Sequence, residues 1–118
     1  MAPTAVDAGT LDTLRSSVGD DPRFFAELID DFLVEGPTQL EVARGALATG
    51  DAELARRAVH TLKGQSRMFG ALDLASLCQD AEAEAAVGDV AAVSVRLDGI
   101  AAELDRARVE LLAARERA

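Results

Sequence analysis

Residues 51–70 read DAELARRAVHTLKGQSRMFG, and this stretch carries the clearest helical pattern of the chain. It begins with Asp51, a residue type that caps helix N-termini, and it ends with Gly70, where a glycine commonly terminates a helix. Between them, small and apolar side chains recur at intervals of three and four, which is the period of a helix with one buried face. The residues of this stripe are Ala55, Val59, Leu62, Ser66 and Phe69.

The opposite face of this predicted helix carries His60, the single histidine of the chain. At about 100° per residue from Ala55, His60 lies at about 140° and therefore points away from the core. Residues 56–67 include four basic residues and no acidic one, although the chain as a whole has a net charge of −9. Such a patch suits a doubly charged phosphoryl group. The cations on the side of His60 are Arg56, Lys63 and Arg67.

Gly64 stands one turn beyond His60, on the same exposed side. A glycine inside a helix costs about 1 kcal/mol relative to alanine, so its presence needs a reason. The missing side chain opens a space through which a backbone or a phosphorylated side chain of another protein can approach the imidazole. A close helix crossing is the alternative, but the helical wheel places Gly64 opposite the core and favours access.

Outward from this stretch, glycine, proline and aspartate divide the chain into further helical segments. A short helix is predicted over residues 10–17, and a long one begins after Asp20 or Asp21 and continues, with a kink, through Gly36-Pro37. A third segment ends at Gly88, and the last begins near Asp89. Because no strand pattern competes, the sequence predicts an all-α fold. We expect an up-and-down antiparallel four-helix bundle with a short extra N-terminal helix.

Three further expectations concern the N-terminus, the core and the surface of this fold. Residues 1–9 contain proline and glycine and no apolar period, so they are predicted to be a flexible tail before a single domain over residues 10–118. Cys78 falls on an apolar stripe and is predicted to lie in the core. The acidic runs at residues 82–84 and 103–105 are predicted to be solvated faces.

The composition restricts the partners and the compartment. A net charge of −9 disfavours binding to nucleic acid and to anionic membrane surfaces. The chain has one cysteine, no apolar run of about 18 residues and no basic-then-apolar leader, which indicates a soluble cytoplasmic protein. We see no metal site in the sequence, and a self-contained bundle makes a monomer the default.

The run His60-Thr61-Leu62-Lys63-Gly64-Gln65-Ser66, followed by Phe69-Gly70-Ala71, resembles the signature of histidine-containing phosphotransfer (HPt) domains. The signature pairs a histidine with lysine three residues on, glycine four on, a small residue six on and glycine ten on, and all five are present. The resemblance extends over roughly residues 24–87.

The resemblance implies that His60 accepts a phosphoryl group on Nε2 and that Lys63, assisted by Arg67, holds its oxygens. Gly64 would give access to the aspartate of a response-regulator receiver domain, and a sensor or hybrid histidine kinase is the other implied partner. No cofactor is implied for this chain, since magnesium belongs to the receiver. Arg56 is a candidate docking residue, as is Met68, for which ordinary surface exposure is the alternative.

Other classes of protein fit less well. A kinase is disfavoured because the chain has no glycine-rich nucleotide loop. The dimerising helix of a histidine kinase would typically carry an acidic residue directly after its histidine, where this chain has Thr61. The remaining alternative is a helical scaffold or inhibitor that binds a receiver or another protein without being phosphorylated.

Overall fold

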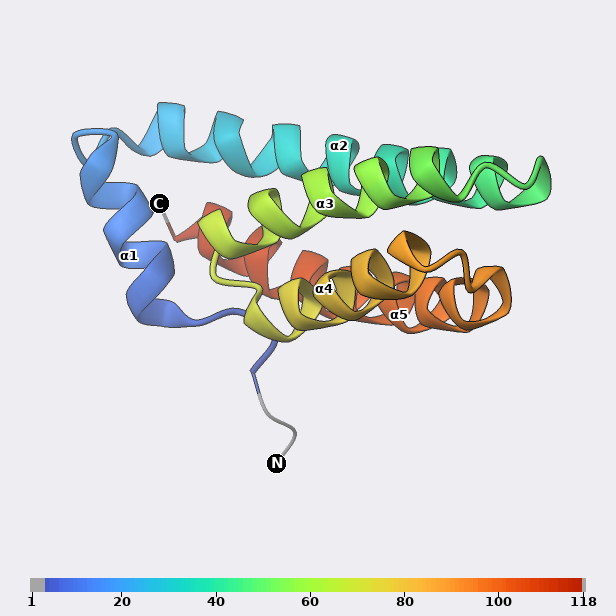
Figure 1. The fold of residues 1–118 in the computed structure, drawn as a ribbon. Coiled ribbons are helices and arrows are strands. Elements are labelled where there is room, and N and C mark those ends of the chain that lie inside the picture. Colours follow the sequence, from blue (N-terminus) through green and yellow to red (C-terminus); the bar gives the residue numbers. More distant parts are fainter. Residues whose placement is uncertain (1–3, 118) are drawn as a thin grey trace.

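The computed structural model describes residues 4–117, which form five helices and no strand (Figure 1). The predicted all-α class is therefore confirmed for this part of the chain. The helices are α1 (Ala8–Ser17), α2 (Pro22–Ala48), α3 (Ala52–Met68), α4 (Leu72–Ala86) and α5 (Val90–Glu116).

Helices α2 to α5 close a ring in which each one packs against two others. Helix α3 packs against α2 and α4, and α5 packs against the same two helices. Figure 1 shows α2 to α5 running alternately in opposite directions, with α1 lying across the end where α2 begins and α5 ends. This arrangement is compatible with the predicted up-and-down bundle.

Aspartate side chains begin four of the five helices. Asp21, rather than Asp20, caps α2 and accepts hydrogen bonds from the backbone N–H groups of Arg23 and Phe24. Asp51 accepts one from Leu54 N at 3.0 Å and so begins α3. A carboxylate at these positions satisfies free N–H groups and also faces the positive end of the helix dipole. The caps of α1 and α5 are Asp7 and Asp89.

Helix α2 continues through Pro37 without interruption, as predicted, while the kink stays a prediction. Packing supplies a reason for the adjacent glycine. Gly36 is buried, and a Cβ atom there would lie 3.1 Å from Leu104 Cδ2 on α5. The close approach of α2 and α5 therefore needs a residue without a side chain at this point.

The N-terminal segment differs from the predicted flexible tail over residues 5–9. Ala5 and Val6 are buried, and their backbone N–H groups donate to the Glu110 carboxylate at 2.6 and 3.0 Å. Asp7 N donates to the carbonyl of Gly70 at 2.8 Å. Two apolar residues are too few to show a period, so the burial of Ala5 and Val6 could not be predicted from the sequence. Residues 1–3 of the predicted tail lie outside the described part of the chain.

The core contains all five stripe residues of the central stretch. Cys78 is completely buried in it, as expected. Burial raises the pKa of the Cys78 thiol to about 12, so the group stays a neutral thiol at physiological pH.

Candidate functional site

Helix α3 divides cleanly into an inner and an outer face. Val59 and Leu62 are each 1% exposed, whereas the His60 side chain between them is 62% exposed. Ser66 is fully buried, and its hydroxyl donates to the backbone carbonyl of Leu62 at 2.7 Å. The predicted packing role of Ser66 therefore agrees with its position, and the imidazole of His60 is left accessible to another molecule.

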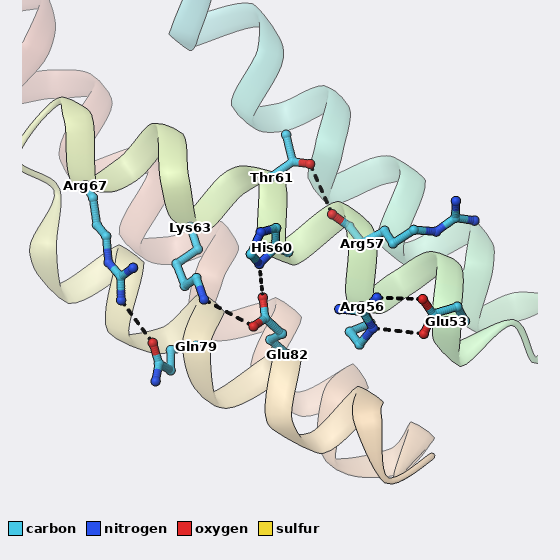
Figure 2. Close-up of polar contacts among 9 residues, drawn as sticks. All are labelled: Glu53, Arg56, Arg57, His60, Thr61, Lys63, Arg67, Gln79 and Glu82. Carbon is cyan, nitrogen blue, oxygen red and sulfur yellow. Dashed lines mark hydrogen bonds and ion pairs between the residues drawn. The ribbon is translucent and has the colours of Figure 1, made fainter.

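The imidazole of His60 is held by a carboxylate from the neighbouring helix. His60 Nδ1 lies 2.6 Å from Glu82 Oε2, across the α3–α4 contact (Figure 2). An ionised carboxylate can only accept a hydrogen bond, so Nδ1 carries the proton in this contact. In the neutral ring, Nε2 then keeps its lone pair.

The same carboxylate also binds Lys63. Lys63 Nζ donates to Glu82 Oε1 at 3.1 Å, and the lysine side chain is only 12% exposed. Figure 2 shows His60 and Lys63, both on α3, converging on Glu82 of α4. One acidic side chain thus links the predicted phosphate acceptor to the predicted phosphate ligand.

Two opposing effects act on the pKa of Glu82. Partial burial pushes the pKa upward, but the hydrogen bonds from Lys63 and His60, together with their charges, lower it below its ordinary value of 4.5. Glu82 is therefore ionised at neutral pH. This supports the assignment of Nδ1 as the donor in its contact with His60.

The prediction that the acidic runs are solvated faces is wrong for three of their glutamates. The side chains of Glu82 and Glu84 are each 22% exposed, and Glu84 accepts from Arg96 Nε at 3.0 Å. Glu103 is 17% exposed and pairs with Arg106. Each of these carboxylates is shielded because a basic side chain lies against it, and the sequence reading gave these acids no partner.

A signal for Glu82 was nevertheless present in the sequence. With Cys78 at zero on the wheel of α4, the buried Ala81 and Ala85 lie at about −60° and −20°. Glu82 lies at about 40°, beside the core rather than opposite it. A carboxylate at that edge is placed to meet a cation from an adjacent helix.

The two predicted arginines have other partners. Arg56 Nε and Nη2 bind the Glu53 carboxylate at 2.8 and 2.6 Å, one turn earlier on α3. The guanidinium holds the pKa of Glu53 below its ordinary value. Arg67 Nη2 donates to Gln79 Oε1 on α4 at 3.0 Å. Of the predicted cations, Lys63 is thus the one that shares a partner with His60.

Gly64 is not required by packing within the described chain. A Cβ atom at Gly64 would meet nothing within 4 Å, in contrast to the crowded position of Gly36. The helix-crossing alternative for Gly64 is therefore wrong for residues 4–117. The open space next to the imidazole is available to another molecule.

Met68 lies on the outer side of α3, as predicted, with 54% of its surface exposed. It lines a shallow, largely apolar groove of about 180 Å³ between α2 and α3, together with Leu28, Phe32 and Phe69. The rings of Phe32 and Phe69 stack with their centroids 4.8 Å apart and form part of this groove.

Residues 4–117 show neither a cluster of metal ligands nor a membrane-spanning helix. Among residues 4–117, no group of three or more histidine, cysteine, aspartate and glutamate side chains is arranged to hold a metal ion. In the same part of the chain, no helix combines the length and the apolar character needed to cross a membrane.

Comparison with known proteins defines the class to which this fold and site belong. Residues 27–110 match the sequence model of the Hpt domain family. The chain therefore belongs to the Hpt domain family. Proteins of this family carry out histidine phosphotransfer in phosphorelays. Proteins of this family are phosphotransfer intermediates rather than kinases or phosphatases, and they interact with receiver domains and histidine kinases.

A solved structure resembles the whole chain. It is the crystal structure of histidine-containing phosphotransfer protein B (HptB) from Pseudomonas aeruginosa PAO1, which superimposes with a TM-score of 0.89 at 27% sequence identity. The match covers 100% of this chain and 99% of that one. The comparison with curated proteins gave no match.

Proposed function

We propose that this protein accepts a phosphoryl group on Nε2 of His60 and exchanges it with the active-site aspartate of a response-regulator receiver domain. The observation that carries this proposal is the 2.6 Å contact between Glu82 and His60 Nδ1. It orients an exposed imidazole and leaves Nε2 as the nucleophilic atom.

The transfer step follows from this arrangement. The Nε2 lone pair attacks the phosphorus of a phosphoaspartate in line with the departing oxygen. The N–P bond forms as the P–O bond breaks, and the aspartate leaves as a carboxylate on the receiver. The Nδ1 proton stays between His60 and Glu82, so this chain needs no separate base. Magnesium is proposed to belong to the receiver, and no cofactor to this chain.

The surrounding residues have supporting roles in the proposal. Lys63 binds the phosphoryl oxygens and Arg67 adds positive charge, since its present partner Gln79 is neutral. Gly64 admits the receiver's aspartate, because the space beside it is open. Met68 and its apolar groove contact the receiver surface, and Arg56 contributes charge at the rim of the contact.

The scaffold is proposed to be an up-and-down four-helix bundle of α2 to α5, with α1 as the short extra N-terminal helix. The ring of packing contacts supports this proposal. We propose that the protein acts as a single-domain monomer in the cytoplasm, without kinase or phosphatase machinery of its own. The partners would supply the remaining catalytic groups.

The test is to incubate the protein with a receiver that carries a labelled phosphoryl group, or with a hybrid kinase and γ-labelled ATP, and to compare wild type with His60→Gln. We expect acid-labile, base-stable label on the wild type and none on the variant. Circular dichroism should show the same helix content in both proteins. Absence of label from the wild type with several receivers would instead favour the scaffold or inhibitor.

A further inference from the structure

The Glu82 carboxylate has two partners that matter for a phosphorylated His60. Oε2 lies 2.6 Å from His60 Nδ1, and Oε1 lies 3.1 Å from Lys63 Nζ. The Lys63 side chain is 12% exposed, and its ammonium is held by this carboxylate of α4. Before any phosphoryl group arrives, the charge of Lys63 is therefore already neutralised by Glu82.

A phosphoryl group on Nε2 would change this balance of charge. It brings roughly −1.5 to −2 charges, which Glu82 repels and which attract the same ammonium. The other two cations predicted on the side of His60 are engaged elsewhere, Arg56 with the Glu53 carboxylate and Arg67 with Gln79. Glu82 and the phosphoryl group thus compete for Lys63.

The proton on Nδ1 acts in the same direction. Attack by the neutral ring gives a phosphorylated imidazole that still carries this proton and therefore a positive charge. When the N–P bond breaks in the reverse transfer, its electron pair returns to Nε2 and the ring leaves as neutral imidazole. Without the proton the ring would leave as an imidazolate, a much poorer leaving group. A carboxylate at Nδ1 retains the proton.

We propose that Glu82 keeps the phosphoryl group of His60 readily transferable, by retaining the proton on Nδ1 and by competing with the phosphoryl oxygens for Lys63. On phosphorylation, the Lys63 ammonium leaves Glu82 and binds the phosphoryl oxygens. When the phosphoryl group is transferred away, the ammonium binds Glu82 again. Glu82 is thus a positioning residue that sets the phosphoryl-transfer potential. This inference rests on the proposed function.

The discriminating variant is Glu82→Gln, because a carboxamide oxygen still accepts from Nδ1 but carries no charge. The matched control is Glu84→Gln, which removes an equal charge from α4 at a residue that contacts Arg96 instead. Each protein is phosphorylated with labelled phosphoramidate, a small phosphodonor that needs no kinase. The measurements are the half-life of the phosphohistidine and its equilibrium with a receiver's aspartate.

We expect Glu82→Gln to lengthen the half-life about fivefold and to shift the equilibrium toward phosphohistidine by a similar factor, as loss of one ion pair would. Glu84→Gln should behave like the wild type. In a Lys63→Ala background, the gain from Glu82→Gln should shrink, because the competition for the ammonium no longer exists.

An unchanged or shortened half-life in Glu82→Gln would overturn the inference while leaving the proposed function intact. If Glu82→Gln lengthens the half-life by the same factor in the Lys63→Ala background, Lys63 does not exchange Glu82 for the phosphoryl group. A wild type that takes up no label, or a His60→Gln variant that does, would instead contradict the proposed function itself. The two failures are therefore distinguishable.

Discussion

The inner and outer faces of α3 are specified in different ways. The inner face, with Val59, Leu62 and Ser66 buried, follows from the helical period of its own sequence. On the outer face, the period locates His60 and Lys63 but does not show that Glu82 of α4 binds both. The comparison teaches that a helix specifies its own buried side, whereas a neighbouring helix decides the state of its exposed charges.

The largest expected effect is a difference in the free energy of unfolding between substitutions on the inner and the outer face of α3. Leu62→Ala removes a side chain that is 1% exposed and should lower the free energy of unfolding by about 3 kcal/mol. Thr61→Ala, the exposed neighbour, should change it by less than about 0.5 kcal/mol. Urea denaturation of both variants measures this difference. Comparable losses at the two positions would show that the faces are not distinct.

A second prediction uses glycines on two helices. Gly64→Leu should slow phosphoryl transfer from a receiver about tenfold, because it fills the space beside His60 and displaces the approaching aspartate. Gly45 of α2 is also exposed with nothing within 4 Å, so Gly45→Leu is the matched control and should transfer normally. Equal rates for both variants and the wild type would remove the steric role of Gly64.

A third prediction concerns the cations of the outer face. Lys63→Ala should shorten the half-life of the phosphohistidine about fivefold, since it removes the cation that shares the Glu82 carboxylate with the ring. Arg56→Ala should have a smaller effect, because Glu53 already binds that guanidinium. The decay of label after removal of the donor gives both values. A larger effect at Arg56 would reverse these assignments.

The smallest expected effect is a dependence of stability on pH. The pKa of Glu82 is lowered by folding, so its contribution is present above the ordinary value of 4.5 and is lost as the pH falls through the lowered value. Because the site is partly exposed, this contribution should be below about 1 kcal/mol. Glu82→Gln should therefore lose less stability than the wild type between pH 5 and pH 3. If the wild type and Glu82→Gln lose the same stability over this pH range, the ionised Glu82 carboxylate does not stabilise the fold through its contacts with His60 and Lys63.

Much of the fold could be predicted because local chemistry determines it. Asp51 and Asp89 cap helices where an acid precedes an apolar period, and the buried stripes follow the same period. The anchoring of Ala5 and Val6 by Glu110 could not be predicted, since it joins residues about a hundred positions apart through backbone donors. Two short apolar residues carry no periodic signal.

The site shows the same limit. The positions of His60 and Gly64 on the outer face followed from the wheel, and the structure agrees with both. The helical wheel gives the angle of each side chain around α3, but it does not say which other helix lies next to that side chain. The pairing of Lys63 with Glu82 therefore became visible only when α3 and α4 were placed side by side.

We propose that His60 accepts the phosphoryl group on Nε2 while Glu82 holds the proton on Nδ1. Nuclear magnetic resonance of the phosphorylated protein with ¹⁵N-labelled histidine observes both nitrogens separately. Phosphorus coupling to Nε2 and a proton retained on Nδ1 are the predicted results. Phosphorus bound to Nδ1, or to any residue other than His60, would contradict the claim.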